Sequence, residues 1–152
     1  MRRLSVLLMA LAALPLFAIL QAEAKAKRCA LTPKQVVTRF IDEFYVKKQV
    51  RSAFERWVDP GYIQHNPFAE TGRDAAVAFL EPAFSNPDVR YEVKRIIADG
   101  NLVAVHAWGT FRKDDAGFAV VDILRVQGCR IMEHWDVMQP VPATAANANG
   151  MF

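Results

Sequence analysis

One acidic residue, Asp122, stands in the middle of an apolar run, 120–124, that is typical of a strand covered on both faces. A buried carboxylate without a partner is costly, so such a side chain is usually paired, protonated or used in chemistry. In an apolar cavity its charged form is destabilised, and it can take up and return a proton near neutral pH. His106 lies in the preceding apolar segment and His134 in the following one. This combination favours acid–base chemistry in a pocket.

Aromatic side chains could wall such a pocket and form a slot for a flat or alicyclic substrate. The candidates are Tyr45, Trp57, Tyr91, Trp108 and Trp135. A carboxylate, an imidazole and aromatic walls suit proton abstraction next to a carbonyl, as in isomerisation or intramolecular aldol closure. Such chemistry needs neither a metal nor a nucleotide cofactor, and we expect neither.

Structural roles remain alternatives for each polar candidate. Asp122 could hold only a structural hydrogen bond, His134 could be an ordinary strand residue, and His65, beside Asn66 and Pro67, could shape a turn. A site with three histidines as metal ligands is a further alternative, although the chain has no close spacing such as His-x-His.

The first half of the chain predicts helices and the second half predicts strands. Thr32, Pro33 and Gln35 form a typical helix start, and apolar residues then recur at helical spacing to about residue 48. Further helices are expected at 51–58 and from Gly72 onwards. Strands are expected at 89–98, 102–112, 118–127 and 130–139. This order predicts an α+β domain in which a cone-shaped, curved antiparallel sheet wraps around three N-terminal helices.

The loops between these strands predict their register. The loops are expected at 99–100, 113–117 and 128–129. Antiparallel pairing across them places His106 diagonal to Asp122 on one face, together with Trp108 and Trp135. The same register places His134 on the opposite face. We therefore predict that Asp122 transfers the proton and that His106 assists it.

The N-terminus has the pattern of a secretory signal peptide. Arg2 and Arg3 precede an almost wholly apolar run, and residues 22–24 (Ala-Glu-Ala) fit a cleavage site. We predict cleavage after about Ala24, a periplasmic or secreted mature protein, and no stable membrane anchor after cleavage. An uncleaved anchor is the alternative, although Pro15 interrupts the apolar run.

The cysteines and the net charge give two further expectations, one about a disulfide and one about partners. An oxidising compartment would favour a disulfide between Cys29 and Cys129, with two free thiols as the alternative. The net charge is +3, and no basic block is present beyond 25–28. We therefore expect no nucleic-acid partner.

Several segments resemble the SnoaL-like polyketide cyclase family of the nuclear-transport-factor-2-like (NTF2-like) superfamily. They are 62–67 (Tyr-Ile-Gln-His-Asn-Pro), 97–106, 122–125, 133–139 (Glu-His-Trp-Asp-Val-Met-Gln) and the closing residues 149–152. The similarity covers about residues 30–152. It includes the secreted group described as predicted SnoaL-like aldol condensation-catalysing enzymes.

The resemblance implies a cone-shaped fold with a pocket for a small-molecule ligand at its open end, and a homodimer formed through the sheet. In the family an aspartate on a sheet strand acts as acid and base near a histidine, and Asp122 and His106 match those positions. Gln64 and Asn66 lie where polar pocket groups are expected, with His65 between them.

Three hypotheses follow for a chain divided into a signal peptide (1–24), a SnoaL-like domain (25–142) and a flexible tail (143–152). The first is a cofactor-independent enzyme that transfers a proton next to a carbonyl. The second is a non-catalytic small-molecule binding protein on the same scaffold. The third is a dimeric interaction module whose tail docks on a partner or closes the pocket. The sequence leaves open whether catalysis occurs.

Overall fold

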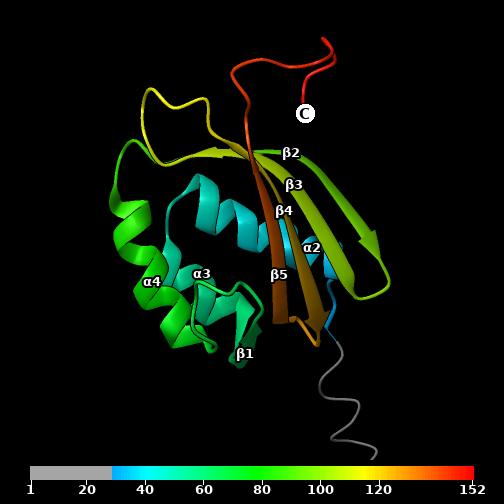
Figure 1. Cartoon of the computed structure of the whole chain (residues 1–152). Helices are drawn as coiled ribbons and strands as arrows, with labels where there is room; N and C mark the ends of the chain where they lie inside the picture. The colour runs from blue at the N-terminus through cyan, green and yellow to red at the C-terminus, as the bar shows by residue number, and fades with distance from the viewer. Residues whose placement is uncertain (1–28) are drawn as a thin grey trace, which may run out of the picture.

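The computed structural model describes residues 29–152 (Figure 1). The predicted signal peptide, 1–24, and its cleavage site lie outside the described residues. No helix within residues 29–152 is both long and apolar enough to cross a membrane.

Helices form the first half of the described chain and strands dominate the second, as predicted. In chain order the elements are α2 (Pro33–Ile41), the π-helical turn η1 (Asp42–Val46), α3 (Val50–Trp57), β1 (Val58–Gln64), α4 (Arg73–Ser85), β2 (Arg90–Asp99), β3 (Leu102–Thr110), β4 (Phe118–Gln127) and β5 (Arg130–Pro140). The predicted capping box starts α2, because the Thr32 side chain accepts from the backbone N–H of Gln35 and the Gln35 side chain accepts from that of Thr32.

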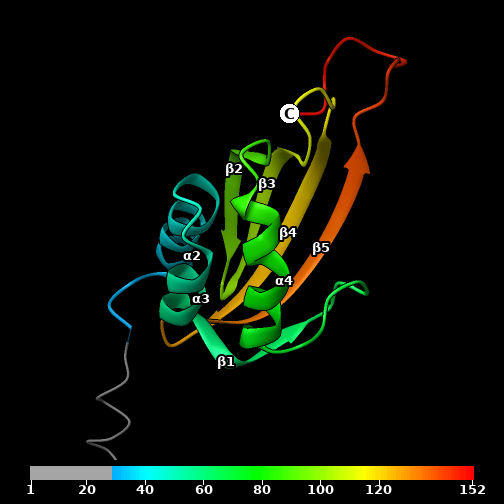
Figure 2. The ribbon, with the colours of Figure 1, turned by 90° about the vertical axis from the view of Figure 1, so that its left-hand side faces the viewer.

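The five strands form one curved sheet in the order β1-β5-β4-β3-β2. Strands β2 to β5 are the expected antiparallel meander. Strand β1 adds an edge that pairs in parallel with β5 and was not among the strands predicted from the sequence. Figure 2 shows α2, α3 and α4 together on one side of the sheet, which bends around them. The predicted α+β cone is confirmed.

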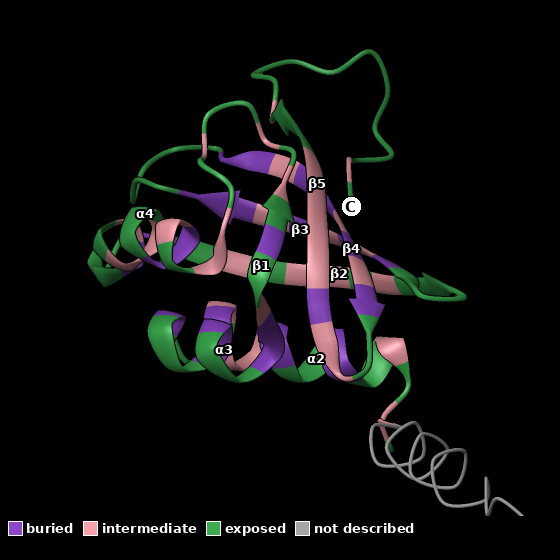
Figure 3. Ribbon diagram, turned by 90° about the horizontal axis from the view of Figure 1, so that it is seen from below, coloured by how far each residue is buried: buried purple, intermediate pink, exposed green. Residues whose placement is uncertain are grey.

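The core lies between the helices and this inner face of the sheet. Figure 3 shows the buried positions gathered where the helices face the strands. Along β3 and β4 buried residues alternate with less buried ones, and Val103, Val105, Val120 and Leu124 are buried on the inner face. This period of two is what a strand with one covered face requires.

The register between β3 and β4 differs from the prediction. Phe118 pairs with Gly109, whereas the expected loop would have paired it with Arg112. The chain leaves the ladder early because the Thr110 hydroxyl bonds both the N–H and the carbonyl of Arg112 and forms a local turn. An odd shift of three residues exchanges the two faces of β3, so His106 lies on the outer face.

The register between β4 and β5 differs for another reason. The loop is at 128–129 as expected, but Arg125 pairs with Glu133 while Val126 pairs with Ile131. One residue, Met132, is therefore extra and forms a β-bulge. This bulge turns His134 to the inner face, where the predicted register had placed Trp135.

The two ends of the described chain are attached to the sheet. A disulfide joins Cys29 to Cys129, with their Cα atoms 5.1 Å apart, and ties the segment before α2 to the β4–β5 turn. Residues 141–152 form neither helix nor strand, and the ring of Phe152 stacks on His106 on the outer face, with the ring centroids 5.7 Å apart. The flexibility expected of the tail stays a prediction.

Candidate functional site

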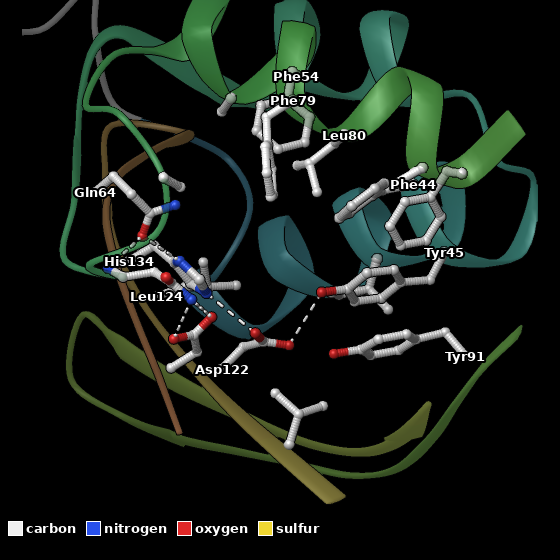
Figure 4. A pocket seen from close by; sticks show the side chains of 18 of the residues that line it. Phe44, Tyr45, Phe54, Gln64, Phe79, Leu80, Tyr91, Asp122, Leu124 and His134 are labelled. Atoms are coloured by element: carbon white, nitrogen blue, oxygen red, sulfur yellow. Dashed lines mark hydrogen bonds and ion pairs between the residues drawn. The ribbon is translucent and has the colours of Figure 1, made fainter. Parts of the chain in front are cut away.

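A cavity of about 300 Å³ opens between the helices and the inner face of the sheet (Figure 4). Its walls are largely aromatic and aliphatic, and they include Phe40, Phe44, Phe54, Phe79, Leu80, Phe84, Phe118 and Leu124. Polar side chains form one part of the lining, and they are Tyr45, Tyr62, Gln64, Asn66, Tyr91, Asp122, His134 and Asp136. The size falls at the lower end of the roughly 300–1,000 Å³ that is usual for small-molecule sites.

Asp122 projects from β4 into this cavity and is only 4% exposed. Its Oδ2 accepts a hydrogen bond from the Tyr45 hydroxyl at 3.1 Å. Its Oδ1 lies 3.1 Å from Nε2 of His134, whose side chain is 13% exposed. Both carboxylate oxygens therefore have hydrogen-bond partners, so the buried carboxylate is not left unsatisfied.

Tyr45 reaches Asp122 from η1. The π-helical turn adds a residue to the helical repeat, and such turns are frequent at functional sites. The ring of Tyr45 stacks on that of Tyr91, with centroids 3.8 Å apart. Gly109 pairs with Tyr91 in the sheet, and a Cβ atom at Gly109 would lie 2.9 Å from the Tyr91 ring. The missing side chain therefore allows Tyr91 to lie close against β3, with its hydroxyl directed toward Asp122 (Figure 4).

The protonation of His134 follows from its second hydrogen bond. Nδ1 of His134 lies 2.9 Å from Oε1 of Gln64, and that oxygen also accepts the backbone N–H of Asn66 at 3.0 Å. A backbone N–H can only donate, so the Gln64 amide must present its oxygen to both groups. His134 therefore carries a proton on Nδ1.

A second proton must lie between His134 and Asp122. With Nδ1 protonated, a neutral imidazole would present a lone pair on Nε2 to a carboxylate oxygen 3.1 Å away. Two acceptors do not form a hydrogen bond, so the pair is either imidazolium with carboxylate or neutral imidazole with carboxylic acid. In both forms Asp122 and His134 together hold one proton between them. A group that holds one exchangeable proton inside a cavity can act as acid or base.

A further carboxylate, Asp136, lies opposite Asp122 on β5. The side-chain amide of Asn66 donates to both of its oxygens, at 2.9 and 2.8 Å. Asp122, His134 and Asp136 present ligand atoms within 4.8 Å of one another, close enough for a divalent cation to be considered. The hydrogen bonds already explain their positions, and a cation would have to displace the shared proton.

The three tyrosine hydroxyls of the cavity remain protonated donors. Burial raises the pKa of Tyr45 and Tyr91 well above the usual value, and the charge of Asp122 raises it further. The pKa of Tyr62 is raised for the same two reasons, in the same order. Tyr62 also accepts a hydrogen bond from Nε2 of Gln64 at 3.1 Å, so it supports the amide that orients His134.

Six of the residues predicted for the site line the cavity. They are Tyr45, Gln64, Asn66, Tyr91, Asp122 and His134. The predicted pairing of Asp122 with His106 is wrong, because the odd shift between β3 and β4 puts His106 on the outer face. The imidazole beside Asp122 belongs to His134, for which the sequence had left an ordinary strand role open.

The other predicted pocket residues lie elsewhere. The Trp108 indole is on the outer face and donates to the carbonyl of Ala116. Trp57 is buried in the core outside the cavity lining. His65 stacks on Trp135 with centroids 4.6 Å apart and bonds Glu133 on the outer face.

Two polar residues of the cavity lining were not predicted, Tyr62 and Asp136. Both lie two positions from a residue that faces the cavity, Gln64 in β1 and His134 in β5. Side chains two apart on a strand share a face. The signal was therefore present, but it required the correct face of β5 and the recognition of β1 as a strand.

The sequence profile of the SnoaL-like domain family matches residues 37–134, more than half of the chain. The chain belongs to this SnoaL-like family. Solved structures similar to this SnoaL-like protein share its NTF2-like fold. An NTF2-like protein of unknown function from Cytophaga hutchinsonii is 15% identical with a TM-score of 0.61, and the match covers 74% of this chain and 94% of that one.

Two further similar structures carry functional descriptions. A candidate ketosteroid isomerase from Kribbella flavida is 18% identical with a TM-score of 0.60, over 76% of this chain and 84% of that one. A candidate polyketide cyclase from Acidithiobacillus ferrooxidans is 19% identical with a TM-score of 0.54, over 72% and 90%. At these identities the likeness shows the fold alone. A comparison with curated proteins found no significant match.

Proposed function

We propose that this SnoaL-like protein is an enzyme that moves a proton at a carbon next to a carbonyl of a small, largely apolar molecule. The observation that carries the proposal is the contact of Asp122 with His134, which is itself bonded to Gln64, inside an aromatic-walled cavity; from these contacts we infer one shared proton. The names of the similar isomerase and cyclase structures agree with this reaction class.

The proposed step uses groups already in place. The carboxylate of Asp122 takes the proton from the carbon, the electron pair of the C–H bond forms a carbon–carbon double bond, and the π pair of the carbonyl moves to its oxygen to form an enolate. The Tyr91 hydroxyl, which stays protonated, is directed toward Asp122 and can donate to that oxygen. Asp122 then returns the proton to the same or another carbon, so no oxidant, metal or cofactor enters the balance.

The remaining hydrogen bonds of the pair set its orientation. Gln64 fixes which nitrogen of His134 faces Asp122, and Tyr45 holds the other carboxylate oxygen. A base held by its neighbours in one position loses less freedom when the substrate binds. His134 is a positioning and proton-sharing residue in this step, and Asp122 is the catalytic residue.

Proton–deuterium exchange tests the proposal without knowledge of the natural substrate. A panel of cyclic ketones is incubated with the protein in D₂O, and loss of the α-proton signal is followed by NMR. We expect Asp122→Asn to slow exchange by about 10²–10⁴-fold, the usual contribution of a general base. The amide can still donate to His134 and accept from Tyr45, so the fold should persist. Exchange at the wild-type rate in Asp122→Asn would refute the proposal.

Matched variants separate the two histidines. His134→Gln removes the imidazole beside Asp122, whereas His106→Gln changes the imidazole on the outer face. Exchange should fall at least tenfold in the first and stay within twofold in the second. The reverse order would show that the outer-face histidine is the one that matters.

A non-catalytic binding protein is the second candidate. It is favoured by the fact that both oxygens of Asp122 already have partners, which a purely structural carboxylate also shows. Ligands that copurify chemically unchanged, combined with no exchange on any ketone of the panel, would support this function and exclude the first.

We further propose export and dimerisation. The N-terminal pattern of residues 1–24 supports cleavage after about Ala24, and an exported protein would retain the Cys29–Cys129 disulfide. N-terminal sequencing of the full chain expressed in a bacterium tests the cleavage. Light scattering on the mature protein tests the dimer.

A further inference from the structure

The charged groups of the cavity do not balance. Asp122 and Asp136 bring two negative charges, and the pair Asp122–His134 holds one compensating proton. Among the described residues that line the cavity, none is a lysine or an arginine. The tyrosine hydroxyls stay neutral because burial raises the pKa of each. The lining therefore carries a net charge of about −1.

Nearby cationic side chains do not supply the missing charge. On the adjoining strand, Arg125 faces the outer side of the sheet and pairs with Glu133, which also bonds His65. Within residues 29–152, the only side chain bonded to Asp136 is the neutral amide of Asn66. Asp136 thus has hydrogen-bond donors but no counter-ion among the described residues.

The walls increase the effect of this charge. An aromatic, largely apolar cavity has a lower effective dielectric than water, so a charge on its lining acts strongly on a bound ligand. A carboxylate or phosphate would meet repulsion, whereas an ammonium group would meet both Asp136 and the faces of aromatic rings.

The proposed reaction adds a second reason. Proton transfer to Asp122 places a negative charge on the enolate and leaves the negative charge of Asp136 unchanged nearby. A protonated amine near the carbonyl would interact favourably with both the enolate and Asp136, so the substrate itself would supply the positive charge that a lysine or a metal supplies in other active sites.

We infer that the cavity selects a carbonyl compound that carries a protonated amine, and that Asp136 is the residue that selects it. The carbonyl part rests on the proposed function, whereas the preference for positive charge does not. Asp136 makes an ion pair with the ammonium group while Asn66 keeps its carboxylate in place. Asp122 remains beside His134 for the proton transfer.

Three flat probes of similar shape test the charge preference directly. Benzylamine, benzyl alcohol and benzoate differ in charge at neutral pH, and their affinities are measured by calorimetry with EDTA present, so that a divalent cation cannot occupy the carboxylates. We expect benzylamine to bind at least tenfold more tightly than benzoate, with benzyl alcohol between them. If benzoate binds to the unmodified protein as tightly as benzylamine does, the inference is overturned.

A matched pair of variants tests the residue. Asp136→Asn should weaken benzylamine binding about tenfold and change benzyl alcohol binding less than twofold. Glu133→Gln removes a similar charge from the same strand on the outer face and should change neither more than twofold. A preference for benzylamine that survives Asp136→Asn, in a variant with wild-type circular dichroism, would show that Asp136 does not select the amine.

The two proposals fail separately. If benzylamine binds most tightly and benzoate least tightly, but no ketone exchanges its proton, the proposed reaction is refuted and a binding site for amines remains. Exchange that depends on Asp122 but is fastest for anionic ketones would refute the charge selection and leave the reaction.

Discussion

Replacing His134 by leucine should destabilise the protein more than any change to the other imidazoles. His134 makes two hydrogen bonds inside the cavity, to the carboxylate of Asp122 and to the amide oxygen of Gln64. A hydrogen bond to a charged group contributes about 1.5–3 kcal/mol and one between neutral groups about 0.5–1.5 kcal/mol. The loss is therefore about 2–4.5 kcal/mol of unfolding free energy. No further penalty for an unpaired buried group is added, because Asp122 and Gln64 each keep one other partner.

The comparison with His106→Leu makes the test specific. His106 stacks on Phe152, which is 39% exposed, so its replacement should cost about 1 kcal/mol or less. Urea unfolding of both variants gives the two losses, provided that the slope with denaturant is unchanged. A loss for His134→Leu no larger than that for His106→Leu would refute the assignment of His134 as the partner of Asp122.

Three further predictions concern pH and the disulfide. The chain has three tyrosines, and the pKa of each is raised in the folded protein. Their contribution to stability is therefore present below pH 10 and is lost as the pH rises beyond it. Absorbance at 295 nm should rise only together with unfolding, and gradual titration of the tyrosines in a folded protein would contradict this. The hydrogen bond from His65 and then that from Arg125 lower the pKa of Glu133, so its contribution is present above about pH 4.5 and is lost as the pH falls through the lowered pKa. The difference in urea midpoint between wild type and Glu133→Gln should therefore shrink between pH 7 and about pH 3, and a constant difference would count against it. The Cys29–Cys129 bond closes a separation of 100 residues, so Cys29→Ser should lower the unfolding free energy by about 3–5 kcal/mol, and equal stability with and without reductant would argue that the bridge does not form.

Patterns within single segments predicted the elements well. The capping box at Thr32, the helical repeat after it and the apolar strands needed only local information, because capping and periodicity are properties of neighbouring residues. The position of Asp122 in an apolar strand was a local signal of the same kind, and the structure places its side chain in the cavity.

The identity of the neighbouring histidine depended on information that no single segment contains. The face that each strand presents changes with every single-residue shift in register. One such change came from the early end of β3, where Thr110 forms a turn with Arg112, and another from the bulge at Met132. Both arise from packing and turn geometry across strands, so the pattern of alternating residues indicated an imidazole beside Asp122 but assigned it to His106.

The parallel strand β1 was missed for a related reason. It contains Pro60 and Gly61, which are unusual within strands, and its pairing with β5 bridges residues far apart in the chain. Because β1 was not recognised as a strand, the sequence did not reveal that Tyr62 and Gln64, two positions apart, both face the cavity. Asp136 was missed because the predicted register had turned its strand the other way.

The tautomer of His134 tests the shared proton most directly. Nitrogen-detected NMR of the imidazole rings at neutral pH distinguishes the two ring nitrogens, and His65 and His106 serve as internal controls among the three histidines of the chain. The geometry predicts a proton on Nδ1 of His134, held by Gln64, and a second proton between Nε2 and Asp122 that is slow to exchange with water. A proton on Nε2 with a bare Nδ1 would contradict it, because Gln64 and Asp122 could not then share one imidazole in the way the structure requires.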